Sequence, residues 1–202
     1  MEFEKEYRTY KVLGVYGSCT DDAETFFTVP KESLTLDLQG IIGERHYGYE
    51  LISGPRQVAQ YQRGTLIRNN RQWTAISPRD IETIQDNLEI QKGLTPELLG
   101  INLLLDGQGR LSELSPRTYL MFSKEDHPFS KGEEAVTLVV YAQVSPCNKA
   151  GRAISTSLGE ASIAQDFKHK ARGYRGITGW VEKGGLIEPG YNCFALTPTG
   201  VE

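Results

Sequence analysis

Short apolar runs, separated by turn-forming residues, dominate the hydrophobic pattern of the chain. Leu34, Leu36 and Leu38 alternate with Thr35 and Asp37, which is the period of a strand with one buried face. The other runs are rich in β-branched or aromatic residues and are bounded by Gly, Pro or Ser. This pattern predicts a mainly β protein with a few short helices and a closed, barrel-like sheet. The predicted strands are Tyr10–Tyr16, Ser33–Leu38, Trp73–Ile76, Ile101–Leu105, Thr118–Phe122, Val136–Val144, Gly176–Glu182 and Tyr191–Leu196.

Two segments have the apolar spacing of helices instead. The segment Ser77–Asp80 supplies a hydroxyl N-cap, a proline at the first helical position and an acid at the third. Ile81, Ile84 and Leu88 then share one face until Gly93. This spacing predicts a helix that begins after Ser77.

The second predicted helix runs from about Glu160 to Ala171 and ends in a group of cations before Gly173. A shorter segment, Thr95–Gly100, has the same opening of cap residue and proline and is expected to be a connecting turn.

Length and composition favour one soluble domain. The 202 residues contain 39% hydrophobic and 24% charged residues and no internal repeat, so we expect a single domain over 1–202 with its core at about 10–198. No apolar run reaches the roughly 18 residues of a membrane-spanning helix. The charged start of the chain does not resemble a secretory signal, and we expect a cytoplasmic protein without a membrane partner.

The charge balance and the cysteines narrow the functional classes. The 22 basic and 26 acidic residues give a net charge of −4, which argues against a nucleic-acid partner but leaves a local anion site open. Three cysteines are too few and too odd in number for a disulfide framework, so reduced thiols are expected. Cys19 precedes two aspartates that disfavour a thiolate, and Cys193 is expected to be an ordinary strand residue.

Cys147 is the most informative thiol, because it directly follows the apolar strand Val136–Val144. With Ser145 as N-cap and Pro146 at the first position of a following turn, free N–H groups would stabilise a Cys147 thiolate. Lys149 and Arg152 add positive charge nearby. The alternative is that Cys147 is a small buried hydrophobic residue at the end of a strand.

Two further segments combine glycines with cations. The loop Gly40–Gly48 carries Arg45 and His46, which could donate to an anion or could simply pair with surface carboxylates such as Glu44. The segment Lys168–Ile177 contains four cationic residues and a histidine, which could neutralise a phosphate or complement a helix end.

Other motifs are less informative. The pairs Arg56–Gln57 and Arg71–Gln72 cannot be distinguished from solvated surface by their local sequence. The histidines His46, His127 and His169 are isolated, and no CxxC, HxH or HExxH spacing occurs, so we do not expect a zinc site built from protein ligands. A metal is expected to arrive with a cofactor.

The order of these segments resembles the MOSC domain, the C-terminal domain of molybdenum-cofactor sulfurases, which also occurs as a stand-alone bacterial protein. The loop Gly40–Gly48 is similar to the family's Gly-x-x-Gly-Asp-Arg-His-x-Gly element, and Leu99–Leu103 is similar to its Gly-Glu-Asn-Leu element. Val144–Lys149 resembles the family's Pro-Cys element, and Arg172–Val181 resembles its closing stretch. Glu44 and Ile101 depart from the family pattern, where Asp and Glu are usual.

The resemblance implies a β-barrel-like domain that binds the molybdenum cofactor or carries sulfur for it as a persulfide on Cys147. It implies that Cys147 and Lys149 take part in catalysis and that Cys147 could instead ligate molybdenum. The residues that it implies for cofactor binding are Arg45, His46, Arg56, Asn102, Arg172 and Arg175.

Three functions remain open on the sequence. The chain could be a sulfur carrier, a storage or delivery module without chemistry, or the cofactor-binding subunit of a reductase that acts on N-hydroxylated compounds. The pyridoxal-phosphate desulfurase domain of the sulfurases has no counterpart in the sequence. The expected partners are therefore the molybdenum cofactor and a separate cysteine desulfurase or electron-transfer protein.

Overall fold

A closed barrel of seven strands organises the chain, as seen in a computed structural model that describes residues 7–18, 26–129 and 135–198. The first strand pairs with both the last strand and β8, which closes the ring, and β7 and β8 form its parallel pair. Closure satisfies the edges that an open sheet would expose. In their order around the barrel, the strands are β1 (Arg8–Ser18), β8 (Leu103–Gly107), β7 (Trp73–Ile76), β11 (Ile177–Lys183), β10 (Val136–Gln143), β9 (Tyr119–Ser123) and β13 (Asn192–Leu196).

The predicted fold class is confirmed, and all eight predicted strands are present with end shifts of one or two residues. The predicted strand Ser33–Leu38 is β3 (Leu34–Asp37), outside the barrel. The strands that the pattern missed are too short to show a period of two. They are β2 (Thr28–Lys31), β4 (Gly40–Ile41), β5 (Glu50–Ile52), β6 (Leu66–Arg68) and β12 (Gly185–Ile187).

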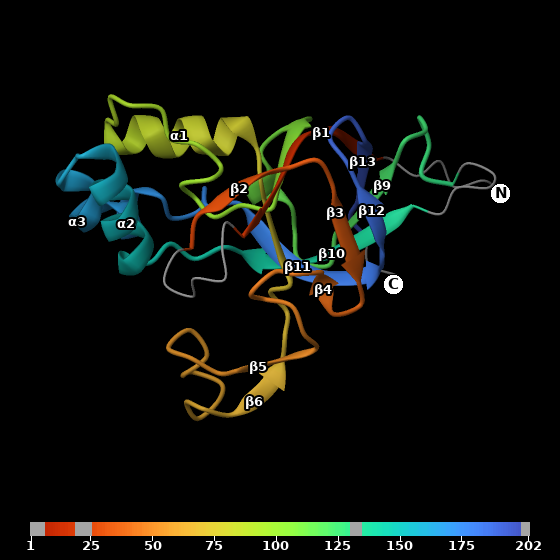
Figure 1. Cartoon of the computed structure of the whole chain (residues 1–202), viewed down its shortest axis with the longest axis horizontal. Helices are drawn as coiled ribbons and strands as arrows, with labels where there is room; N and C mark the ends of the chain where they lie inside the picture. Colours follow the sequence, from red (N-terminus) through yellow and green to blue (C-terminus); the bar gives the residue numbers. More distant parts are fainter. Residues whose placement is uncertain (1–6, 19–25, 130–134, 199–202) are drawn as a thin grey trace.

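Three helices lie together beside the barrel, on the left in Figure 1: α1 (Pro78–Leu88), α2 (Asn148–Leu158) and α3 (Ser162–Lys170). The barrel encloses one apolar cluster, and the helices pack around a second cluster that includes Ile84 and Phe167. A short 3-10 turn, η1 (Leu111–Glu113), follows β8. In the described part of the chain, no helix is long and apolar enough to span a membrane.

The helix predictions were partly correct. Ser77 and Asp80 form the predicted capping box of α1, but the helix ends at Leu88 because Glu89 adopts a left-handed conformation at φ 57°. The sequence predicted only a turn where α2 forms, with Ser145 as its N-cap. The N-cap is Cys147, so that prediction is wrong by two residues.

A small hairpin lobe, formed by β5 and β6, stands apart from the barrel at the bottom of Figure 1. The loop between its strands carries Arg56. Ile52, Val58 and Leu66 on this lobe are each more than half exposed. The lobe therefore buries little apolar surface of its own, and its contribution to the site is to hold Arg56.

Asn102 connects three of the barrel strands. Its side-chain oxygen accepts hydrogen bonds from the backbone N–H and hydroxyl of Thr74, both at 3.0 Å, and its Nδ2 donates to the Tyr16 carbonyl at 3.3 Å. Asn102 is 6% exposed, so water cannot replace these partners without structural change. The amide thus ties β7 and β1 to the segment that enters β8.

We expect Asn102→Ala to lower the free energy of unfolding by about 1–3 kcal/mol, because it leaves the buried backbone N–H of Thr74 without its acceptor. Chemical denaturation measures this change. The control is Asn148→Ala, which truncates an exposed amide. Equal stability of the two variants would contradict a structural role of the Asn102 amide.

Candidate functional site

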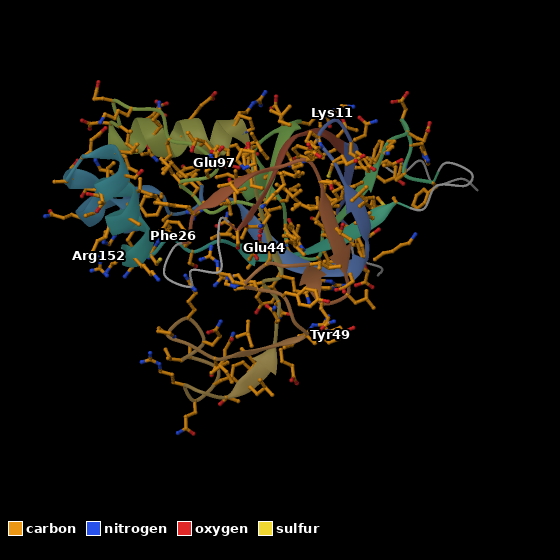
Figure 2. All side chains as sticks on the ribbon, viewed as in Figure 1. Lys11, Phe26, Glu44, Tyr49, Glu97 and Arg152 are labelled. Carbon is orange, nitrogen blue, oxygen red and sulfur yellow. The ribbon has the colours of Figure 1, made fainter. Side chains whose placement is uncertain are left out.

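A cavity of about 370 Å³ opens where the helices meet one end of the barrel. Its wall includes loop residues 44–46, residues 71, 72 and 74 at the start of β7, the turn around Gly100, and residues 144–147, 149 and 150 at the start of α2. Phe26 and Glu44, which also line it, lie between the helical layer and the barrel in Figure 2. The cavity thus collects residues that are far apart in the sequence.

Cys147 lines this cavity as the N-cap residue of α2. Its Sγ accepts a hydrogen bond from the Ala150 backbone N–H at 3.5 Å, and its carbonyl accepts from Gly151 N at 3.1 Å. The thiol is half-buried, which fits neither a fully solvated side chain nor the core residue of the alternative interpretation. The unpaired backbone N–H groups of the first turn of α2 would stabilise a negative charge on Sγ.

Arg175 is the most buried cation of the cavity, with 6% of its surface exposed. Its Nη2 donates to the Leu99 carbonyl, and its guanidinium carbon Cζ lies 5.9 Å from the centroid of the Phe167 ring. Within the described ranges, its Nε and Nη1 have no hydrogen-bond partner. Burial, only partly opposed by the nearby Cys147, lowers the pKa of Arg175 to about 10. Two donors of a buried guanidinium are therefore left without an acceptor.

Arg71 and Arg56 add two more cations to the same wall. Burial and then the charge of Arg56 lower the pKa of Arg71 to about 10. The ring of His46 is accessible from the open side of the cavity, yet the surrounding protein and the charge of Arg71 lower its pKa to about 4. His46 is therefore neutral at pH 7, while the arginines stay charged.

Two buried side-chain amides hold the loop that carries His46, because they donate hydrogen bonds to backbone carbonyls. Asn69 Nδ2 donates to the carbonyls of His46 at 2.7 Å and of Gly48 at 2.9 Å, and Gln72 Nε2 donates to the Leu38 carbonyl at 3.1 Å. Gly40, at φ 124°, lets the loop approach Gln72, because a Cβ there would lie 3.0 Å from the Gln72 Cβ. These contacts fix the loop against the start of β7.

Glu44 is the acidic residue of the cavity wall. Its carboxylate accepts hydrogen bonds from the backbone N–H of Ser18 and, at 2.9 Å, from the Ser18 hydroxyl. These hydrogen bonds of Glu44 go to Ser18, so they do not support the alternative in which Glu44 pairs with Arg45 and His46 at the surface. Among the described residues, five cationic side chains line the cavity against this one acid: Arg45, Arg56, Arg71, Lys149 and Arg175.

The structure brings most of the predicted site residues to one place. Arg172 is the exception, since it is exposed after α3 and does not line the cavity. Lys168 and Lys170 lie in the last turn of α3, as expected for the helix-end alternative. The predicted residues that line the cavity are Arg45, His46, Arg56, Asn102, Cys147, Lys149 and Arg175.

The local sequence does not distinguish Arg71 and Gln72 from solvated surface residues. In the structure, Gln72 is buried and Arg71 lines the cavity. Their position directly before the apolar strand β7 is the signal that could have identified them. Cys19, with its two neighbouring aspartates, lies outside the described residues. No group of three or more His, Cys, Asp or Glu side chains that could hold a metal occurs in the described part of the chain.

We expect Arg71→Met to raise the pKa of His46 from about 4 toward its ordinary value, because the variant removes a neighbouring cation. A folded-state pKa below the unfolded value of about 6.5 means that the unfolded chain binds more protons, so His46 makes stability fall as pH falls from about 6.5 to 4. An NMR titration of the ring measures the shift, with exposed Arg63→Met as control. An unchanged midpoint in Arg71→Met would contradict this coupling.

Comparison with known proteins identifies relatives along most of the chain. YuaD of Bacillus subtilis (strain 168), which is provisionally assigned to metal-sulfur cluster biosynthesis, is 28% identical over 183 residues, covering 90% of this chain and 88% of YuaD. The crystal structure of the YuaD protein from Bacillus subtilis superposes with a TM-score of 0.84 at 26% identity, covering 96% of this chain and all of that one.

A more distant structure shares the fold alone. YiiM from Geobacillus stearothermophilus has a TM-score of 0.57 at 13% identity and covers 93% of this chain and 75% of its own. The family model described as the MOSC domain matches residues 55–193, which include Cys147 and Arg175. The barrel, the cavity and this match agree, and the chain belongs to the MOSC domain family.

Proposed function

We propose that this protein carries sulfur for the molybdenum cofactor as a persulfide on Cys147. The observation that carries the proposal is the Cys147 thiol at the N-terminus of α2, on the wall of a cavity whose described lining has five cations and one acid. MOSC domains are associated with the molybdenum cofactor, and the description of YuaD names metal-sulfur chemistry. Both support a role in sulfur supply to a metal centre.

The surroundings of Cys147 suit a persulfide anion. In loading, the Cys147 thiolate attacks the terminal sulfur of a donor persulfide, the Sγ–S bond forms, and the donor leaves as a thiolate. The Ala150 N–H and the first turn of α2 favour negative charge on either sulfur. Lys149 lines the cavity and is exposed, so its ammonium group can stay close to the negatively charged terminal sulfur during transfer.

The cavity also fits the sulfur acceptor as a substrate. Its volume of about 370 Å³ lies within the usual range for small-molecule sites. The molybdenum cofactor carries a phosphate and an anionic metal-dithiolene group, which match the guanidiniums of Arg45, Arg56, Arg71 and Arg175. The unpartnered donors of Arg175 are the observation that favours binding of such an anion.

We expect Cys147→Ser to lose all sulfur loading and to remain folded, because serine is a better N-cap than cysteine and occupies nearly the same volume. Purified protein is incubated with glutathione persulfide, and intact-mass spectrometry detects the added sulfur atom. Cys193→Ala is the matched thiol control, since burial raises the pKa of Cys193 and keeps it unreactive. If the added sulfur appeared on Cys147→Ser and not on the wild type, the assignment of Cys147 as the sulfur carrier would be refuted.

We expect anaerobic gel filtration with the molybdenum cofactor to show pterin fluorescence and molybdenum eluting together with the wild type. Arg175→Met should weaken this binding about tenfold, because a charged hydrogen-bond donor is lost, whereas Arg172→Met should bind as the wild type does. Cofactor binding by a wild type that takes up no sulfur from glutathione persulfide would indicate a storage module. Elution of cofactor apart from the wild type would reject cofactor binding.

A further inference from the structure

We propose that the cavity takes a sulfur oxyanion of the thiosulfate class as a direct sulfur donor to Cys147. The inference rests on the proposed function, because it names the source of the sulfur that Cys147 carries. It is drawn from the juxtaposition of a thiol and a buried, incompletely paired guanidinium in one cavity. Such a donor would let the chain acquire sulfur without a partner protein.

The first argument is the unsatisfied state of Arg175. A buried cation with free donors is costly, and native proteins normally pair such groups. In the described part of the chain, Arg175 makes one hydrogen bond, to the Leu99 carbonyl, while its Nε and Nη1 have none. Nε and Nη1 lie on different sides of the guanidinium plane, so each can donate a separate charge-assisted hydrogen bond to an anion in the cavity.

The second argument is the position of Cys147 relative to two guanidiniums. Cys147, Arg71 and Arg175 line the same cavity, so a thiolate on Cys147 would interact favourably with both guanidiniums. Arg56 repels the same two cations and so raises the free energy of the empty cavity. A small dianion would relieve this repulsion more than a neutral or singly charged ligand.

The third argument selects the chemical class of the anion. Phosphate or sulfate would satisfy the guanidiniums, but neither has an atom that a thiolate can attack in an exchange reaction. Thiosulfate has both parts, a sulfonate group that Arg175 and Arg71 can bind and a sulfane sulfur that can face Cys147. The sulfonate is also the leaving group, so the cations that bind it stabilise the charge that it gains during transfer.

The transfer balances without an external oxidant or reductant. The Cys147 thiolate attacks the sulfane sulfur of thiosulfate, the Sγ–S bond forms, and the bond between the two thiosulfate sulfurs breaks. Sulfite leaves with the bonding electron pair, so three negative charges are present before and after the step. The thiol proton is lost to solvent before the attack.

The test incubates the intact protein with thiosulfate and measures released sulfite together with the mass of the protein. We expect one sulfite per chain and one added sulfur on Cys147, and catalytic thiocyanate formation when cyanide is added as acceptor. Arg175→Met should slow the loading from thiosulfate by roughly tenfold or more, and by a larger factor than it slows the loading from glutathione persulfide. The matched control, Arg172→Met, replaces an exposed arginine outside the cavity.

A measurement on the wild type alone keeps the inference testable if Arg175→Met does not fold. Sulfate should compete with thiosulfate and slow sulfite release, because it binds the same guanidiniums without reacting. Loading from glutathione persulfide but not from thiosulfate would overturn this inference and leave the proposed function intact. Loading from neither donor would overturn both, and equal thiosulfate rates for folded Arg175→Met and the wild type would remove Arg175 from the site.

Discussion

Positive charge that the described residues leave largely uncompensated is the constraint on which the site depends. Arg56, Arg71 and Arg175 face one cavity, and the acid on its wall, Glu44, is already hydrogen-bonded to Ser18. Burial lowers the pKa of Arg71 and Arg175, but only to about 10, so both remain charged at neutral pH. Such an arrangement destabilises the empty protein and stabilises any complex with an anion.

The fold has to oppose this repulsion with rigid structure. The closed barrel fixes the ends of β7, β8 and β11, from which Arg71, Asn102 and Arg175 approach the cavity. Buried amides then connect the loops to these strands: Gln72 accepts from the Val181 N–H at 2.8 Å, and Asn69 holds the loop that carries His46. Because these amides bond to backbone groups, the cations cannot move apart without breaking buried hydrogen bonds.

The sequence predicted the barrel well because its strands alternate or are continuously apolar and are separated by glycine and proline. It did not predict α2, whose residues include a glycine and several β-branched or hydroxyl residues with low helix propensity. The structure supplies the reason: a Cβ on Gly151 would lie 2.9 Å from the Phe167 Cβ, so the glycine permits α2 to pack closely on α3. Tertiary packing therefore outweighs local propensity there.

The residues of the candidate site also differ in how well the sequence predicts them. Cys147 and Arg175 could be predicted because each adjoins a recognisable strand and a glycine or proline. The position of Arg71 directly before β7 is a weaker signal, because the role of this residue depends on a cavity formed by segments distant in sequence. The hydrogen bonds between the Asn102 amide and Thr74, which give Asn102 a structural role besides its place on the cavity wall, could not be predicted from the sequence.

The choice of cysteine at the N-cap of α2 is itself informative. Serine, threonine, aspartate and asparagine are the preferred N-caps, whereas a thiol is a weak hydrogen-bond acceptor, and the 3.5 Å contact from Ala150 N to Sγ is correspondingly long. Ser145 stands two residues earlier and does not cap the helix. The chain thus forgoes a stronger cap at the position where the helix meets the cations, which is the trade expected when a nucleophilic sulfur, rather than helix stability, is needed at that point.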